Sequence, residues 1–175
     1  KEERLGVKKW GKAAFLFYLS ATEGNFNFYN NLVKVPALAT IPFLSPISYS
    51  GLVAYKFKTV RIEQKGAHKI YTLSVKPRKV SNATVEGELT ITDSAWVVLQ
   101  SRFRFPAYHM PEYDFFEVAQ QYMPVEGKAM LLSRQQFTYF TKKGKGKLSG
   151  QTTVHYTDYE IQKEFAKKHF GVEVS

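Results

Sequence analysis

The stretch of sequence that decides the fold is "IYTLSVKPRKVSNATVEGELTITDSAWVVLQ", residues 70–100. On both sides of a basic segment that holds Lys76, Arg78 and Lys79, apolar and polar residues alternate. Successive side chains of a strand point to opposite faces of a sheet, so this alternation predicts strands. The basic segment is then either a site for an anion or the solvated turn between two strands.

The same two-residue rhythm continues from Val53 to Tyr156. Short alternating runs are separated by turn segments such as "EQKGAH", "TDSA" and "VEGK", and no helical pattern lies between them. This pattern is typical of an antiparallel meander. We therefore expect a mainly β fold, a strongly curved antiparallel sheet that resembles half a barrel, with one or two short helices. The first strand is expected to begin near Val53, which would share a face with Tyr55 and Phe57.

The rest of the chain divides into segments around this sheet. Residues 1–22 form an N-terminal segment whose apolar residues recur at helical spacing, which favours a short amphipathic helix, with a buried strand over residues 13–19 as the alternative. Residues 23–50 contain three prolines and predict an extended connection that packs along the body of the protein. Residues 51–175 form the antiparallel β domain, whose tail is expected to end in a helical turn before Gly171.

Composition limits the classes of function. The chain has 175 residues, enough for one domain, and it contains no cysteine, which excludes disulfides, cysteine-ligated zinc and thiol nucleophiles. Its longest apolar run, residues 13–19, is far shorter than the roughly 18 residues of a membrane-spanning helix. The net charge of +10 favours polyanionic partners, namely nucleic acid, an anionic lipid surface or lipopolysaccharide-like headgroups. The opening "KEERLGVKKWGK" does not begin with Met, so we expect a piece of a longer protein.

No catalytic signature accompanies the strand pattern. The four histidines are scattered, and neither a metal-ligand spacing nor a cofactor fingerprint is present. Carboxylates at i,i+2 spacing would lie on one face of a strand, as a glycosidase-like pair requires. The pairs are Glu86 and Glu88, Glu112 and Asp114, and Asp158 and Glu160. The outward face of a half-exposed sheet has the same pattern of carboxylates. We therefore expect a non-enzymatic protein without metal or cofactor. The alternative is a hydrolase that uses such a carboxylate pair.

Basic side chains gather in two turns. The candidate contacts for an anionic partner are Lys76, Arg78, Lys79, Lys142, Lys143, Lys145 and Lys147. Proteins that bind single-stranded nucleic acid combine such charges with exposed aromatic rings. Here the rings lie on the inward face of the strands and the charges lie in turns, where lysine also discourages pairing between strand edges. The pattern therefore favours a solvated turn without a binding role. A second alternative for the function of the chain is a basic domain that binds an anionic polymer or nucleic acid.

Two segments resemble a known family. In residues 42–59 a Pro-x-x-x-Pro-x-Ser pattern precedes a Tyr-Lys-Phe strand, and in residues 71–96 "VKPRK" is followed by Gly87, Ile91 and Asp93. The second segment continues into residues 132–161. Both are similar to the uncharacterised region of Gram-negative outer-membrane proteins that carry an N-terminal carboxypeptidase-like regulatory domain and a C-terminal β-barrel. The resemblance brings no catalytic motif with it.

This resemblance implies a location in the periplasm, attached to the outer membrane through a longer parent protein. Its partner would be the barrel of the same polypeptide or another envelope protein. The curved meander is also similar, more weakly, to the half-barrel of lipoprotein-carrier proteins, which shelter acyl chains against a concave apolar face. The likeness implies a module that docks a partner or binds a lipid-like or apolar ligand. The face would be lined by Leu73, Leu89, Phe103, Phe105, Phe137 and Tyr139, which otherwise form an ordinary core.

Overall fold

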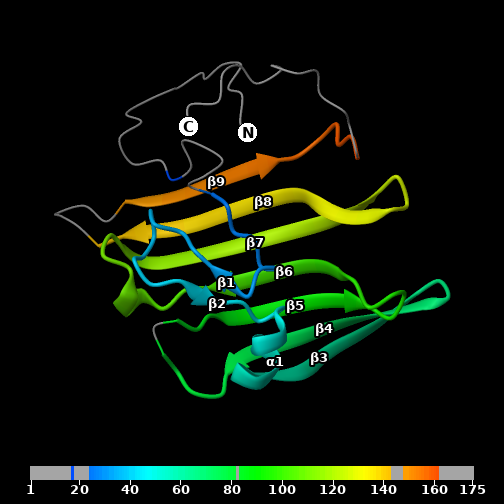
Figure 1. Cartoon of the computed structure of the whole chain (residues 1–175), viewed down its shortest axis with the longest axis horizontal. Coiled ribbons are helices and arrows are strands. Elements are labelled where there is room, and N and C mark those ends of the chain that lie inside the picture. The colour runs from blue at the N-terminus through cyan, green and yellow to red at the C-terminus, as the bar shows by residue number, and fades with distance from the viewer. Residues whose placement is uncertain (1–16, 18–23, 82, 143–147, 162–175) are drawn as a thin grey trace, which may run out of the picture.

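The computed structural model describes residues 17, 24–81, 83–142 and 148–161, most of which belong to one strand-rich body (Figure 1). Seven antiparallel strands follow one another as a meander, in the order β3-β4-β5-β6-β7-β8-β9. They are β3 (Tyr55–Lys65), β4 (His68–Pro77), β5 (Glu86–Thr92), β6 (Val98–Arg104), β7 (Tyr113–Val125), β8 (Ala129–Thr141) and β9 (Ser149–His155). The prediction of a mainly β fold built on an antiparallel sheet is confirmed.

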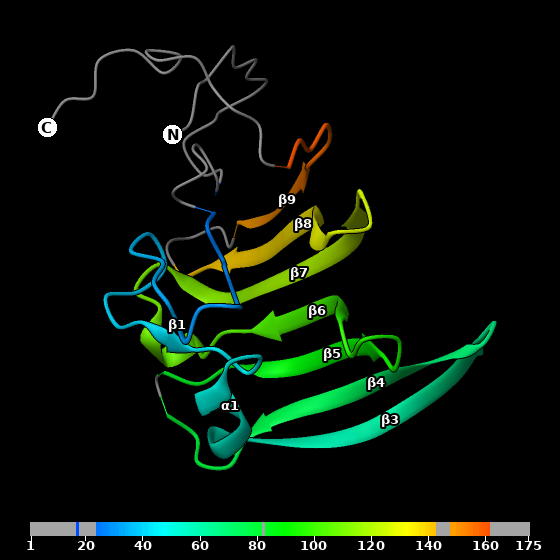
Figure 2. The same cartoon turned by 45° about the vertical axis from the view of Figure 1, so that its right-hand side comes forward.

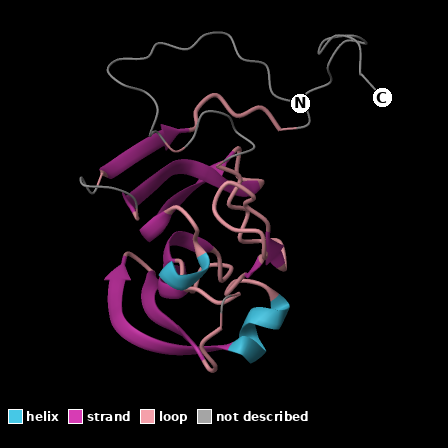
Figure 3. Cartoon of the chain, turned by 90° about the vertical axis from the view of Figure 1, so that its left-hand side faces the viewer, coloured by secondary structure: helices cyan, strands magenta, loops and turns pink. Residues whose placement is uncertain are grey.

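The sheet curves strongly and stays open (Figures 2 and 3). Register shifts that mark β-bulges lie between Thr59 and Arg61 in β3, at Leu99 in β6 and at Ser133 in β8. A bulge bends its strand and increases the local twist. Strands β3 and β9 are the two edges of the sheet and are not neighbours of each other. The sheet therefore has the shape of half a barrel, with an inner face that other parts of the chain can cover.

Residues 24–48, here called the strap, cross the inner face of the sheet (Figure 1). Within the strap, β1 (Leu32–Val33) pairs with β2 (Phe43–Leu44) to form a separate two-stranded sheet. Seen from the side, the large sheet curves around these loops (Figure 3). The strap is therefore the layer that packs against the half-barrel.

The strap fills the inner face with aromatic side chains. Its first residues alternate in burial, so that Phe26 and Phe28 point inward. The ring centroid of Phe28 lies 4.9 Å from that of Phe103, and the centroid of Phe26 lies 5.5 Å from that of Phe105. Such aromatic pairs stabilise by about 0.5–1.5 kcal/mol beyond the effect of area burial. The core of the domain is thus shared between the sheet and the strap.

A short helix, α1 (Tyr49–Ala54), connects the strap to β3. The hydroxyl of Ser48 accepts a hydrogen bond of 3.1 Å from the backbone N–H of Gly51 and so caps the first turn. A Cβ at Gly51 would lie 2.4 Å from the carbonyl oxygen of Ser45, so this close approach requires glycine. The prediction that Val53 begins the first strand is wrong, because this residue belongs to the capped helix and is 74% exposed.

Two expected elements lie outside the described residues. Of the helix expected within residues 1–22, only Phe17 is described, and the turn expected before Gly171 is not. The ring of Phe17 is buried, and its centroid lies 4.7 Å from that of Phe116 on β7. The core therefore includes at least one aromatic side chain that precedes the strap.

Candidate functional site

A row of polar side chains interrupts the apolar inner face of the sheet. Ser101 of β6, Gln120 of β7 and Gln135 of β8 are each at most 2% exposed. Ser101 is the cross-strand partner of Gln120, and Gln120 is the cross-strand partner of Gln135. Cross-strand partners share a face of the sheet, so the three side chains lie side by side. Buried amides are costly unless they form hydrogen bonds, and the partners of these two lie in the strap.

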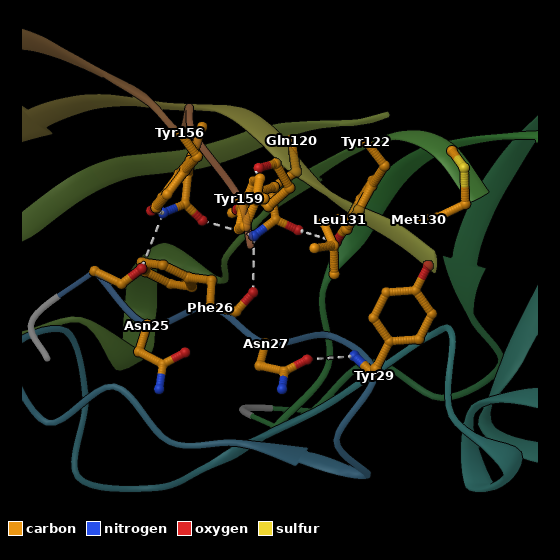
Figure 4. A pocket seen from close by; sticks show the side chains of 13 residues that line it. Asn25, Phe26, Asn27, Tyr29, Gln120, Tyr122, Met130, Leu131, Tyr156 and Tyr159 are labelled. Atoms are coloured by element: carbon orange, nitrogen blue, oxygen red, sulfur yellow. Dashed lines mark hydrogen bonds between the residues drawn. The ribbon is translucent and has the colours of Figure 1, made fainter. Parts of the chain in front are cut away.

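Gln120 and Gln135, here called the glutamine clamp, hold the strap by its backbone (Figure 4). Nε2 of Gln120 donates to the carbonyl oxygen of Phe26 at 2.8 Å, and Nε2 of Gln135 donates to that of Gly24 at 3.0 Å. The two amides are joined at 2.6 Å, from Nε2 of Gln120 to Oε1 of Gln135. The hydroxyl of Tyr122 donates to Oε1 of Gln120 at 2.7 Å. The start of the strap is thus fixed where it crosses β7 and β8.

A groove of about 820 Å³ lies beside the glutamine clamp (Figure 4). It is bounded by the start of the strap, by β7 and β8, and by the segment that follows β9. Four tyrosines, two glutamines, two asparagines and three aliphatic side chains, Met130, Leu131 and Leu132, contribute to its lining. Its volume lies in the range of about 300–1,000 Å³ that is typical of small-molecule sites.

Tyr29 and Tyr122 form an aromatic wall of the groove. Their ring centroids lie 5.7 Å apart, and the ring planes are nearly perpendicular at 86°. Burial raises the pKa of Tyr122, and the neighbouring Tyr29 raises it further. Burial also raises the pKa of Tyr29. Both phenols therefore stay neutral at physiological pH and offer hydroxyl groups that can donate and accept hydrogen bonds.

The lining of the groove combines apolar side chains with amides and phenols. Among the residues that the structure describes, no Asp, Glu, His, Lys or Arg lines the groove. General acid–base catalysis needs a titrating group within reach of the substrate, and a nucleophile needs a base that activates it. Aliphatic and aromatic surface with a few amides and phenols instead suits an uncharged ligand. Within the part of the chain that the structure describes, no group of three or more His, Cys, Asp or Glu residues could hold a metal ion.

The carboxylate pairs expected from the sequence lie outside this groove. Glu86 of β5 forms an ion pair with Arg104 of β6. The remaining carboxylates of these pairs are exposed: Glu88, Glu112, Asp114, Asp158 and Glu160. None of the six contributes to the lining of the groove.

The six residues expected to bind an apolar ligand lie together in the core. Leu89, Phe103, Phe105, Phe137 and Tyr139 are at most 6% exposed, and Leu73 packs against the same cluster. The strap covers this face, and none of the six lines the groove. Phe105 also lines a smaller pocket of about 330 Å³ at the ends of β5 and β6, whereas the strap covers most of the other five side chains. Whether they bind a ligand stays a prediction.

The basic residues expected to contact an anionic partner fall into three groups. Lys76, Arg78 and Lys79 are exposed where β4 ends. Lys142 is occupied within the protein, because its Nζ donates to the carbonyl oxygens of Ala107 and Met110 at 3.0 and 2.7 Å. The others, Lys143, Lys145 and Lys147, lie outside the described residues.

Sequence reasoning did not identify the glutamine clamp. The signal is present in the stretches "VAQQY" (118–122) and "QQF" (135–137), where one glutamine of each pair occupies an inward position. Val118 and Phe137 fix the inward parity, and Gln120 and Gln135 follow it at a distance of two residues. A glutamine in register with buried apolar residues therefore indicates a buried amide that needs a partner.

Comparisons with known proteins assign a family and no activity. The model described as "Family of unknown function (DUF5686)" matches residues 1–159, which is most of the chain. No curated protein and no solved structure matches it. In the described part of the chain, no helix has both the length and the apolar character needed to cross a membrane.

Proposed function

We propose a non-enzymatic binding role for this chain, which belongs to the DUF5686 family. The observation that carries the proposal is the groove of about 820 Å³ beside the glutamine clamp, whose lining residues in the described part of the chain are uncharged. A groove without acid, base or cationic side chains has the means to bind a ligand but lacks side chains for general acid–base chemistry. The proposed ligand is lipid-like, with an apolar part and a few hydrogen-bonding groups.

The lining supports this class of ligand. Met130, Leu131 and Leu132 offer aliphatic surface for the apolar part. Asn25 and Asn27 are exposed on the strap, and their amides can bind polar groups at the edge of the groove. A fatty chain laid on the inner face of the sheet, as in the lipoprotein-carrier likeness, would compete with Phe26 and Phe28 for the same space. The groove is therefore the better candidate for the site.

The proposal places this module in the periplasm, attached through a longer parent protein to the outer membrane. Support for the location comes from the sequence resemblance in residues 42–59 and 71–96 to regions of outer-membrane proteins. The partner in this proposal is the barrel of the same polypeptide or another envelope protein. Detection of the parent protein in outer-membrane fractions tests this part of the proposal, and its recovery from the cytoplasm would contradict it.

The binding role is tested with the neutral apolar dye 1-N-phenylnaphthylamine, whose fluorescence rises on transfer out of water. The chain is expected to bind the dye saturably, and a lipid extract is expected to displace it. Tyr29→Ala should weaken dye binding about two- to tenfold, because an aromatic contact contributes about 0.5–1.5 kcal/mol. Tyr108→Ala is the matched control, because Tyr108 is similarly exposed, at 62% against 52% for Tyr29, and does not line the groove.

Two results would remove the proposal. One is the absence of saturable dye binding together with the absence of copurifying lipid in a native mass spectrum. The other is an equal loss of binding in Tyr29→Ala and Tyr108→Ala, which would place the dye elsewhere on the protein. Circular dichroism of each variant establishes that the sheet is intact.

A further inference from the structure

A second surface, which shares no lining residue with the groove, combines projecting apolar side chains with positively charged side chains that form no ion pair within the described part of the chain. It consists of the outer side of α1 and the adjoining ends of β3 and β4, which lie together (Figures 1 and 2). The backbone N–H of Arg78, just after β4, donates to the carbonyl oxygen of Ala54 in α1 at 2.8 Å. This surface, here called the basic tip, contains Tyr49, Leu52, Val53, Lys56, Lys58, Lys76, Arg78 and Lys79.

The apolar side chains of the basic tip stand out from the protein. Tyr49, Leu52 and Val53 are 87%, 62% and 74% exposed. Their spacing of three and four residues places them on one side of α1. The other side of the helix is fixed by the buried Gly51, which packs against the backbone of residues 45–46. The orientation of α1 is therefore set by the strap, and it keeps three large apolar side chains in solvent.

The basic side chains of the tip are also unpaired. Lys56 of β3 and Lys76 of β4 are direct cross-strand partners, so two like charges face each other on the sheet. Like charges directly opposite each other destabilise a sheet. Lys58 lies on the same face as Lys56, two residues further along β3. Among the described residues, no ion pair involves the five basic residues of the tip.

Neighbouring strands show that this excess is local. On β5, β6 and β7 two ion pairs join charged side chains, Arg104 with Glu86 and Arg102 with Glu117, and Glu88 of β5 lies opposite Ser74 of β4. The five basic side chains at the β3 edge of the sheet, next to α1, outnumber this carboxylate. An anionic partner would relieve the repulsion between Lys56 and Lys76.

We propose that the basic tip docks onto an anionic lipid surface, with Tyr49, Leu52 and Val53 entering the headgroup layer and the lysines contacting lipid phosphates. Apolar side chains beside lysine and arginine are the combination with which proteins bind such surfaces. An acidic protein would need a matching cavity for three projecting side chains, whereas a lipid layer accepts them without one. The proposal does not depend on the groove or on its ligand.

Vesicle sedimentation tests the charge requirement. The full chain is expected to sediment with vesicles of phosphatidylcholine and phosphatidylglycerol at low salt, and to remain in solution with pure phosphatidylcholine. Replacement of Lys56, Lys58 and Lys76 together by Gln should lower the partition coefficient by about one to two orders of magnitude. The matched control replaces Lys65, Lys69 and Lys128 by Gln, which removes the same charge from exposed lysines in or beside the strand-joining turns at 66–67 and 126–128.

A single fluorescent label tests which surface meets the lipid. Because the chain has no cysteine, Leu52→Cys provides a unique thiol for the environment-sensitive dye NBD. Its emission should shift to the blue and brighten on anionic vesicles. The same label at Gln64→Cys, an exposed position next to the β3–β4 turn, should not respond.

Three outcomes would overturn the proposal. The first is the absence of binding to the anionic vesicles. The second is an equal loss of binding in the two lysine triple variants, or a response of the Gln64→Cys label without one at Leu52→Cys. The third is unchanged vesicle binding in Leu52→Ser/Val53→Ser, which would show that the apolar side chains of α1 do not enter the lipid layer. Circular dichroism shows for each variant that the sheet is folded, so that loss of binding is not loss of structure.

Discussion

Replacement of Gln120 by methionine tests the role of the glutamine clamp. Methionine has nearly the same length as glutamine and keeps the site filled, but it cannot donate to the strap. The carbonyl oxygen of Phe26 and Oε1 of Gln135 would lose the hydrogen bonds of 2.8 and 2.6 Å that Nε2 of Gln120 provides. The hydroxyl of Tyr122 would lose its acceptor as well, although it lines the groove and can turn toward water.

The expected cost follows from the number of buried groups left without a partner. Each buried polar atom that loses its hydrogen bond costs about 1–3 kcal/mol, so the carbonyl oxygen of Phe26 and Oε1 of Gln135 together give a loss of about 2–6 kcal/mol in the free energy of unfolding. Gln121→Met is the matched control. Gln121 is the next residue of β7 and is exposed, so its replacement should change stability by less than about 0.5 kcal/mol.

Urea unfolding followed by far-UV circular dichroism measures both variants. Hydrogen exchange read by mass spectrometry should also show faster exchange in residues 24–31 for Gln120→Met alone. In a double-mutant cycle with Gln135→Met, the two losses should sum to more than the loss in the double variant, because the two amides share partners. Equal stability of Gln120→Met and Gln121→Met would refute the assignment of Gln120 and Gln135 as the clamp on the strap.

Three further predictions follow from individual residues. Phe28→Ala should lower the free energy of unfolding by about 3–5 kcal/mol, because the ring is fully buried against Phe103, and a loss near zero in urea unfolding would contradict the packing of the strap. Gly87→Ala should cost about 1–3 kcal/mol by the same assay, since its Cβ would lie 1.9 Å from the carbonyl oxygen of Arg102; a neutral substitution would show that β5 and β6 are further apart. Burial raises the pKa of Tyr55 from 10.0 to about 12, so the folded state favours its neutral form. This contribution to stability is complete below pH 10 and is lost as the pH rises to about 12, and Tyr55→Phe should flatten that part of the stability curve measured by urea unfolding. An equally steep decline in the variant would contradict the shift.

Much of the fold can be predicted from the period of the sequence. The alternation in residues 70–100 places Leu73 and Leu89 on the same face, and the structure pairs them directly. The inward positions of Phe103 and Phe137 follow from the same rule, because a buried face specifies the register of a strand. The strap is also readable in part, since "GNFNFY" (24–29) alternates small or polar residues with aromatic rings.

Other features depend on contacts that no local pattern contains. Val53 fits the alternation of β3, but the cap at Ser48 and the close approach at Gly51 form a helix that extends through this residue. Lys142 has the sequence context of a solvated turn, and its ammonium group instead binds carbonyl oxygens of Ala107 and Met110. To predict either feature, one would need to know which distant segment of the chain packs against the residue.

The position of the candidate site also could not be predicted from local sequence patterns. A groove between the strap and the sheet exists only because residues more than 90 positions apart meet, such as Phe26 and Gln120. The sequence indicates that aromatic rings point inward and that residues 23–50 pack along the body, but it does not say that this segment covers the inner face of the sheet. Because the strap covers the centre of the sheet, the candidate binding surface is the groove beside the glutamine clamp and not the inner face of the sheet.

The central claim is that the strap fills the inner face of the half-barrel. Nuclear Overhauser effects between aromatic ring protons test it most directly in solution. Strong cross-peaks are expected between Phe28 and Phe103 and between Phe26 and Phe105, whose ring centroids lie 4.9 and 5.5 Å apart. A folded sheet that shows cross-strand contacts between β6 and β7 but lacks both strap contacts would contradict the account.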